Sequence, residues 1–139
     1  MGNQRPILFM CAHGAMRSPV AASLLIARSG GSVEAGSAGL DPDPQMSPLA
    51  VEALEEIGLQ IEAGAPRQWS AESLATSRVI WLGGPLPVEL RDCDVERWEV
   101  SQEPVRDLQA ARRLRHELEE RIALLFTPDN RSGQQLADR

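Results

Sequence analysis

The chain has 139 residues with a formal net charge of −6, and 42% of its residues are hydrophobic while 24% are charged. This balance is typical of one soluble globular domain, and the acidic charge argues against a nucleic-acid partner. All 14 basic residues are arginines. The absence of lysine excludes anion binding by a lysine and Schiff-base chemistry.

Strand and helix patterns alternate along the chain. Short apolar or alternating runs predict strands, and apolar residues at helical spacing predict helices that follow them. Ser18 is the predicted N-cap of the first helix, and the Gly30-Gly31 pair is its predicted end. The expected strands are 6–11, 33–39, 78–84 and 95–100, and the expected helices are 18–31, 47–58, 70–77 and 104–126.

This alternation predicts an α/β fold with a doubly wound, four-stranded parallel sheet flanked by helices. We expect residues 1–126 to form a single domain and the polar residues 127–139 to form a flexible C-terminal tail. Two cysteines argue against a disulfide framework, and neither a membrane-spanning run nor a signal-peptide pattern is present. We therefore expect a cytoplasmic protein without a membrane partner.

The segment MCAHGAMRSP (10–19) contains the strongest functional signal. Cys11 ends the first predicted strand, which is where parallel sheets bind ligands, and the following loop enters a helix N-terminus. Backbone N–H groups of such a loop and the guanidinium of Arg17 match a tetrahedral oxyanion, and their positive charge favours a thiolate. The segment predicts an oxyanion site with a nucleophile, although an inert core cysteine is the alternative interpretation.

The stretch ILFMCAHGAMRSPVAASLL resembles the opening of the low-molecular-weight protein tyrosine phosphatase superfamily, which includes thiol-dependent arsenate reductases. SAG (37–39), SPLAVEALEEIGLQI, PRQWS and RWEV…EP extend the resemblance over residues 6–126. It implies that Cys11 is the nucleophile, that Ser18 stabilises its thiolate, and that Glu103 is the acid that protonates the leaving oxygen. The oxyanion would be held by Arg17 together with the backbone of Ala12, His13, Gly14, Ala15 and Met16.

Three departures from the family pattern bear on the reaction. Gly14 stands where the family loop usually has Asn, and glycine adopts a strained backbone conformation without side-chain bonds. Glu103 stands in an acid loop that usually carries Asp before proline. The chain has no Tyr, and Val105 follows the Glu-Pro pair, so an aromatic wall for phosphotyrosine is missing unless Trp69 supplies it.

His13 and Ala15 make the loop closer to that of arsenate reductases than to that of phosphatases. The only other cysteine, Cys93, lies between two aspartates that disfavour its thiolate, and we interpret it as structural. We therefore predict an arsenate reductase of the kind that serves arsenic resistance, completed by an external small-molecule thiol or by a thioredoxin-like or glutaredoxin-like protein. The alternatives are a phosphatase that hydrolyses phosphomonoesters through a Cys11 thiophosphate, and an inactive relative that only binds phosphate.

The sequence predicts no bound cofactor and no metal site. Its two histidines, His13 and His116, are far apart, and no other side chains complete a ligand spacing typical of a metal centre. His116 falls in the charged stretch RRLRHELEER, and we interpret it as a solvated residue on the last helix.

Overall fold

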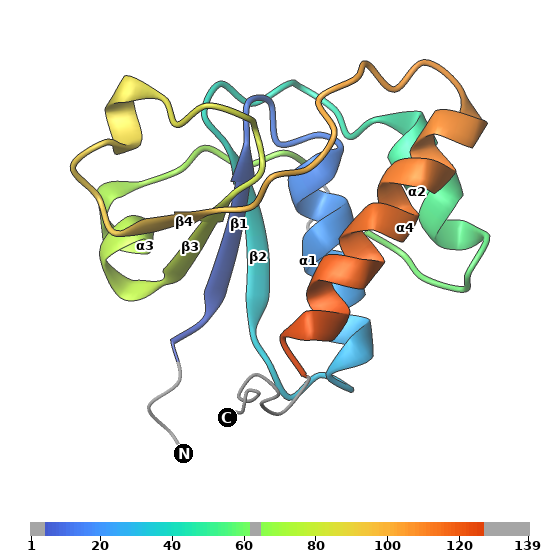
Figure 1. The fold of residues 1–139 in the computed structure, drawn as a ribbon, viewed down its shortest axis with the longest axis horizontal. Coiled ribbons are helices and arrows are strands. Elements are labelled where there is room, and N and C mark those ends of the chain that lie inside the picture. Colours follow the sequence, from blue (N-terminus) through green and yellow to red (C-terminus); the bar gives the residue numbers. More distant parts are fainter. Residues whose placement is uncertain (1–4, 62–64, 127–139) are drawn as a thin grey trace.

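A computed structural model describes residues 5–61 and 65–126 of the chain, and in this part strands and helices alternate as expected (Figure 1). A short 3₁₀ helix, η1 (Val88–Leu90), interrupts the connection between the last two strands. The strands are β1 (Ile7–Cys11), β2 (Ala35–Gly39), β3 (Arg78–Trp81) and β4 (Val95–Arg97), and the helices are α1 (Arg17–Arg28), α2 (Pro48–Glu55), α3 (Ala71–Thr76) and α4 (Leu108–Leu124).

The four strands form one parallel sheet in the order β2-β1-β3-β4. The predicted fold class is therefore confirmed. β1 is central, and its last residue, Cys11, pairs in register with Gly39 at the end of β2. All carboxyl ends of parallel strands lie on one edge, so the segments that leave β1, β2 and β3 meet there.

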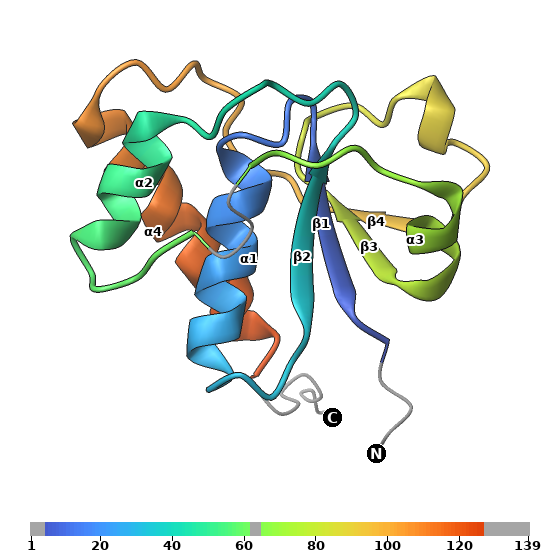
Figure 2. The same ribbon diagram turned by 180° about the vertical axis from the view of Figure 1, so that it is seen from behind.

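The sheet buries side chains on both of its faces because alternate residues of each strand point in opposite directions. Phe9 and Ile80 pack into a cluster with residues of α1, α2 and α4, while Met10 and Val79 pack on the other face. Figures 1 and 2 show the same division, with α1, α2 and α4 on one side of the sheet and α3 on the other. A core of this kind fixes the position of the strand that ends in Cys11.

The starts of α1 and α4 differ from the prediction. α1 begins at Arg17 and its N-cap position is Met16, so Ser18 is not the cap. Ser18 is completely buried inside the first turn, where its hydroxyl faces Cys11 rather than a free backbone N–H. α4 begins at Leu108 instead of 104, because Asp107 caps it with a 2.8 Å hydrogen bond from the Ala110 N–H.

Other boundaries lie within three residues of the predicted ones. Gly30 and Gly31 adopt positive φ angles of 65° and 85° just after α1, and Ser70 caps α3 through the Ser73 N–H. The strands β3 and β4 end three residues before their predicted limits. The predicted tail, 127–139, lies outside the described residues. No helix within 5–61 and 65–126 has the length and apolar character needed to cross a bilayer.

Candidate active site

Cys11 and Ser18 meet at the start of the loop that joins β1 to α1. The Cys11 Sγ lies 3.2 Å from the Ser18 Oγ, and both residues are buried. The Ser18 hydroxyl also lies 3.4 Å from the Ala38 carbonyl oxygen, a long contact that it can give up. A hydroxyl in this position can donate a hydrogen bond to a thiolate at Cys11, the role that the family resemblance implies for Ser18.

The segment that follows β2 donates hydrogen bonds to backbone carbonyls of the loop that follows β1. N–H groups of Leu40, Asp41, Asp43 and Ser47 donate, in that order, to the carbonyls of Cys11, Ala12, His13 and Ala15 at 2.8–3.0 Å. In a trans peptide the C=O of one residue and the N–H of the next point in opposite directions. Four N–H groups of the loop, those of Ala12, His13, Gly14 and Met16, are thereby turned away from the 40–47 segment.

These inward N–H groups are available to a ligand. Within the described part of the chain, the backbone N–H groups of residues 12–16 donate no hydrogen bond. Several backbone N–H groups without an acceptor in one short loop form a site that is suited to an oxyanion. The loop ends where α1 begins at Arg17, and the N–H groups of the first helical turn add positive potential at the same place.

Gly14 has the conformation that the sequence comparison anticipated, with a φ of 66°. A second constraint on Gly14 is steric: a Cβ at this position would lie only 2.8 Å from the Gly39 nitrogen. A Cβ at Gly39 would meet the His13 carbonyl carbon at 2.6 Å. The two backbones therefore pack directly on each other, and glycine is required at both positions.

The Arg17 guanidinium binds the loop that follows β4. Its Nε donates to the Ser101 carbonyl and its Nη2 to the Glu103 carbonyl, each at 2.9 Å. Burial lowers the pKa of Arg17 below its ordinary value, while the charges of Cys11 and Glu117 oppose this shift. The guanidinium thus joins the first residue of α1 to the 98–107 segment.

Glu103 is brought to Arg17 through its backbone. Besides its carbonyl, its N–H is fixed by a 3.2 Å bond to the Ser101 hydroxyl, and its side chain is exposed. Arg17, Glu103 and Glu117 line a cavity of about 260 Å³ between this segment and α4. The structure therefore places the backbone of Glu103 beside Arg17, although the two residues lie 86 positions apart in the sequence.

His13 lies on the outer side of the loop. Its Nδ1 is 3.1 Å from the Asp41 carbonyl and 3.6 Å from the Asp43 carboxylate, and its side chain is 60% exposed. The DPDP segment (41–44) therefore supports the loop. The backbone of His13 belongs to the 12–16 loop, and its ring lies on the exposed side of that loop.

Two other candidate residues lie elsewhere. Trp69 is half-buried and packs against the apolar cluster around Met10 and Trp81, so it contributes to the core. Cys93 is a free, half-buried cysteine whose N–H donates to the Leu90 carbonyl in the turn after η1. Among the described residues no group of three or more His, Cys, Asp or Glu side chains could hold a metal ion.

A larger cavity of about 380 Å³ opens at the amino ends of β1 and β3. Arg5, Arg78 and Phe126 are among its lining residues, and none of the candidate residues borders it. It lies at the edge of the sheet opposite to Cys11, where strands of a parallel sheet begin rather than end. The cavity therefore does not belong to the candidate site.

Four residues of the site were missed by sequence reasoning: Gly39, Asp43, Ser101 and Glu117. Gly39 and Asp43 belong to SAGLDPDP, whose place beside β1 follows only from the strand order. Ser101 and Glu117 are ordinary polar residues, and no spacing in the sequence distinguishes them from surface positions. Only the fold brings them next to Arg17.

Comparisons with known proteins agree with this geometry. The family model described as low molecular weight phosphotyrosine protein phosphatase matches residues 6–82, more than half of the chain. The structure is similar to a thioredoxin-dependent arsenate reductase from Corynebacterium glutamicum, with 31% sequence identity and a TM-score of 0.71. That match covers 91% of this chain but only 62% of the Corynebacterium chain.

Two further solved structures cover nearly the whole of both chains. An arsenate reductase from Archaeoglobus fulgidus has 27% identity and a TM-score of 0.70, over 86% of this chain and 97% of that one. A tyrosine phosphatase from Erwinia amylovora has 18% identity and a TM-score of 0.68, over 86% and 89%. The second of these shows a common fold alone.

Proposed function

Because this chain belongs to the low molecular weight phosphotyrosine protein phosphatase family, we propose that it is an arsenate reductase whose nucleophile is Cys11. The observation that carries this choice is the composition of the loop and its surroundings. The loop is suited to a small tetrahedral anion, and the one aromatic residue considered as a wall for a phosphotyrosine ring, Trp69, is partly buried against the apolar cluster around Met10. The Corynebacterium arsenate reductase, at 31% identity, supports the same choice.

The proposed reaction assigns each of these groups a step. The Cys11 thiolate attacks arsenic(V), an S–As bond forms, and one arsenate oxygen leaves as water with a proton from Glu103. The loop N–H groups and the Arg17 guanidinium hold the remaining oxygens and stabilise the charge that develops on them. Ser18 donates to the sulfur when it is a thiolate.

The second half of the reaction needs an external thiol. A thiolate attacks the Cys11 sulfur, an S–S bond forms, and the electron pair of the S–As bond leaves with arsenic as arsenite. Arsenic gains two electrons and the two sulfurs lose them, and a further thiol reduces the disulfide that results. A thioredoxin-like or glutaredoxin-like protein or a small-molecule thiol would supply these groups. We assign Cys93 no part in this step.

Hydrolysis of phosphomonoesters is the second candidate function. It is favoured by the description of the family model that matches residues 6–82. In this reaction Cys11 attacks phosphorus, Glu103 protonates the leaving oxygen, and water hydrolyses the thiophosphate. An inactive phosphate-binding relative is a third possibility, and any turnover that Cys11→Ser abolishes would exclude it.

One experiment separates the two reactions. Arsenite release is measured with added thioredoxin system, glutaredoxin system or a small thiol, and p-nitrophenyl phosphate hydrolysis is measured at mildly acid pH. We expect arsenite release that depends on Cys11 and on added reductant, with slow hydrolysis at most. Mass spectrometry of the protein during turnover then identifies the linked cysteines: a Cys11–Cys93 disulfide would contradict the external-thiol step, and fast hydrolysis without arsenite release would support the phosphatase.

A further inference from the structure

We propose that Glu117 on α4 is a positioning residue that orients the Arg17 guanidinium through the peptide of Ser101. The inference rests on the proposed function only in that Arg17 holds the oxyanion there. No part of the reaction assigned above uses Glu117. Its effect would be on the affinity of the site for an oxyanion.

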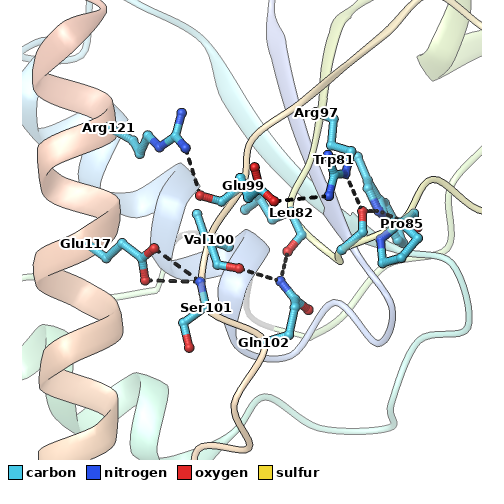
Figure 3. A network of polar contacts seen from close by, with 11 residues as sticks. Trp81, Leu82, Pro85, Arg97, Glu99, Val100, Ser101, Gln102, Glu117 and Arg121 are labelled. Carbon is cyan, nitrogen blue, oxygen red and sulfur yellow. Dashed lines mark hydrogen bonds and ion pairs between the residues drawn. The ribbon is translucent and has the colours of Figure 1, made fainter.

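Glu117, Ser101 and Arg17 form a continuous chain of hydrogen bonds. The Ser101 N–H lies 3.2 Å from Oε1 and 3.1 Å from Oε2 of Glu117, as Figure 3 shows. The carbonyl of the same residue accepts the Arg17 Nε–H at 2.9 Å. Ser101 is exposed, so these hydrogen bonds rather than packing determine where its carbonyl lies.

Glu117 is a rigid anchor for this chain of contacts. It is half-buried, and its neighbours on α4, Leu114 and Leu118, belong to the apolar core that α4 shares with α1. The Ser101 N–H is therefore tied to a helix whose own position is fixed. Arg121 and Gln102 also hold this segment, through contacts with the Glu99 and Leu82 carbonyls, but Glu117 binds the Ser101 peptide itself.

Two hydrogen bonds to this anchored segment fix the plane of the Arg17 guanidinium. A guanidinium has five N–H donors, and the Ser101 and Glu103 carbonyls take one on Nε and one on Nη2. Both hydrogens of Nη1 and the second hydrogen of Nη2 remain for an anion. Arg17 has lost part of its hydration through burial, and the Glu117 carboxylate is one of two negative charges that favour its charged form.

A second contact between α4 and this segment supplies a control. Arg121, one turn further along the helix, donates through Nη2 to the Glu99 carbonyl at 2.7 Å (Figure 3). This contact also fastens the segment to α4, but it involves neither Ser101 nor Arg17. Substitution of Arg121 therefore tests the effect of loosening the segment from α4, whereas substitution of Glu117 tests the effect of losing the orientation of the Arg17 guanidinium.

The test measures the dissociation constant of inorganic phosphate by titration calorimetry. Glu117→Ala and Glu117→Gln remove the same charge, but only glutamine keeps an oxygen that accepts from Ser101. We expect phosphate to bind Glu117→Ala about tenfold more weakly than Glu117→Gln, which corresponds to one hydrogen bond. Arg121→Ala is expected to stay within about twofold of wild type, as is Glu119→Gln, which removes an equal charge elsewhere on α4.

Equal phosphate affinities for Glu117→Ala and Glu117→Gln would overturn the inference, and so would an equal loss in Arg121→Ala. If Glu117→Ala does not fold, Glu117→Asp replaces it, since aspartate keeps the charge and loses the reach. It is then expected to bind phosphate about tenfold more weakly than wild type, and unchanged affinity would overturn the inference. A wild-type protein that binds no phosphate would instead overturn the proposed oxyanion site, and the inference with it.

Discussion

The backbones of Gly14 and Gly39 are in direct contact: a Cβ on Gly14 would lie 2.8 Å from the nitrogen of Gly39. This contact joins the loop after β1 to the end of β2 and leaves no room for a side chain. In this chain the contact therefore favours glycine at position 14, where the family loop usually has asparagine. The same contact makes the shape of the cradle sensitive to a single methyl group.

Gly14→Ala is predicted to destabilise the protein more than Gly30→Ala. The two glycines have φ angles of 66° and 65°, so both substitutions incur the same left-handed strain, about 1–2 kcal/mol. A Cβ at Gly30 meets nothing within 4 Å, whereas one at Gly14 must displace the backbone of Gly39, which adds about 1–3 kcal/mol. Chemical denaturation measures both variants, and equal losses would show that the contact is relaxed in solution.

Ser18→Ala is predicted to slow the reaction of Cys11 about tenfold to a hundredfold, the value of a hydrogen bond to a charged group. Ser37→Ala is the matched control. Ser37 is also buried, but within the described residues its hydroxyl has no hydrogen-bond partner, so its removal is expected to be neutral or stabilising. Single-turnover rates with arsenate test the pair, and a wild-type rate in Ser18→Ala would remove Ser18 from the site.

Glu103→Gln is predicted to lower kcat by about a hundredfold while KM changes little, because general acid catalysis has at least this value. The Arg17 contact is made by the backbone carbonyl of Glu103, which glutamine retains. The anion site should therefore stay intact. A variant with an unchanged kcat would assign the proton to another group, and a large rise in KM would show that the carboxylate supports binding.

The fold could be predicted from the sequence because its signals are local. PILFMC, VEAGSAG and RVIWLGG are short runs between turn residues, and the apolar positions of α4 keep helical spacing. The pairing of Cys11 with Arg17 in one site could also be predicted, since a loop of only five residues joins them. The errors at Ser18 and at the start of α4 have a tertiary cause. The Ser18 hydroxyl contacts Cys11 instead of capping the helix. In the segment before α4, Ser101 is bound by Arg17 and Glu117, and no helix starts there.

The rest of the site depends on contacts between distant segments. Gly39, Ser101 and Glu117 are positioned by the order of the strands and by the packing of α4, which no local pattern encodes. Trp69 illustrates the opposite case, because an aromatic residue after a loop is compatible with a site or with a core. Only the structure places it in the core.

Glu56 is predicted to make stability depend on pH under acid conditions. Hydrogen bonds from Arg112 and Arg115 lower the pKa of Glu56 from 4.5 to about 2. The ionised form is thus favoured in the folded protein, and this contribution is complete above the unfolded pKa and is lost as the pH falls through about 2. Wild type should be more stable than Glu56→Gln at neutral pH, and the difference should disappear in strong acid.

Thermal unfolding across this pH range measures the effect. Glu55→Gln, the neighbouring substitution with the same change in charge, is the control for the loss of a negative charge at the end of α2. A constant difference between wild type and Glu56→Gln at every pH would mean that the two arginines do not hold the carboxylate in solution. The cluster joins α2 to α4, so its loss also weakens the helix that carries Glu117.

The most direct test of the central claim is the rate at which iodoacetate alkylates each cysteine at mildly acid pH, where an ordinary thiol with a pKa of about 8.5 is almost wholly protonated. Mass spectrometry distinguishes Cys11 from Cys93. If Cys11 is a thiolate inside an oxyanion cradle, it is alkylated much faster than Cys93, and both arsenate and phosphate protect it. Equal rates for the two cysteines, or fast alkylation of Cys11 that neither anion slows, would contradict the account.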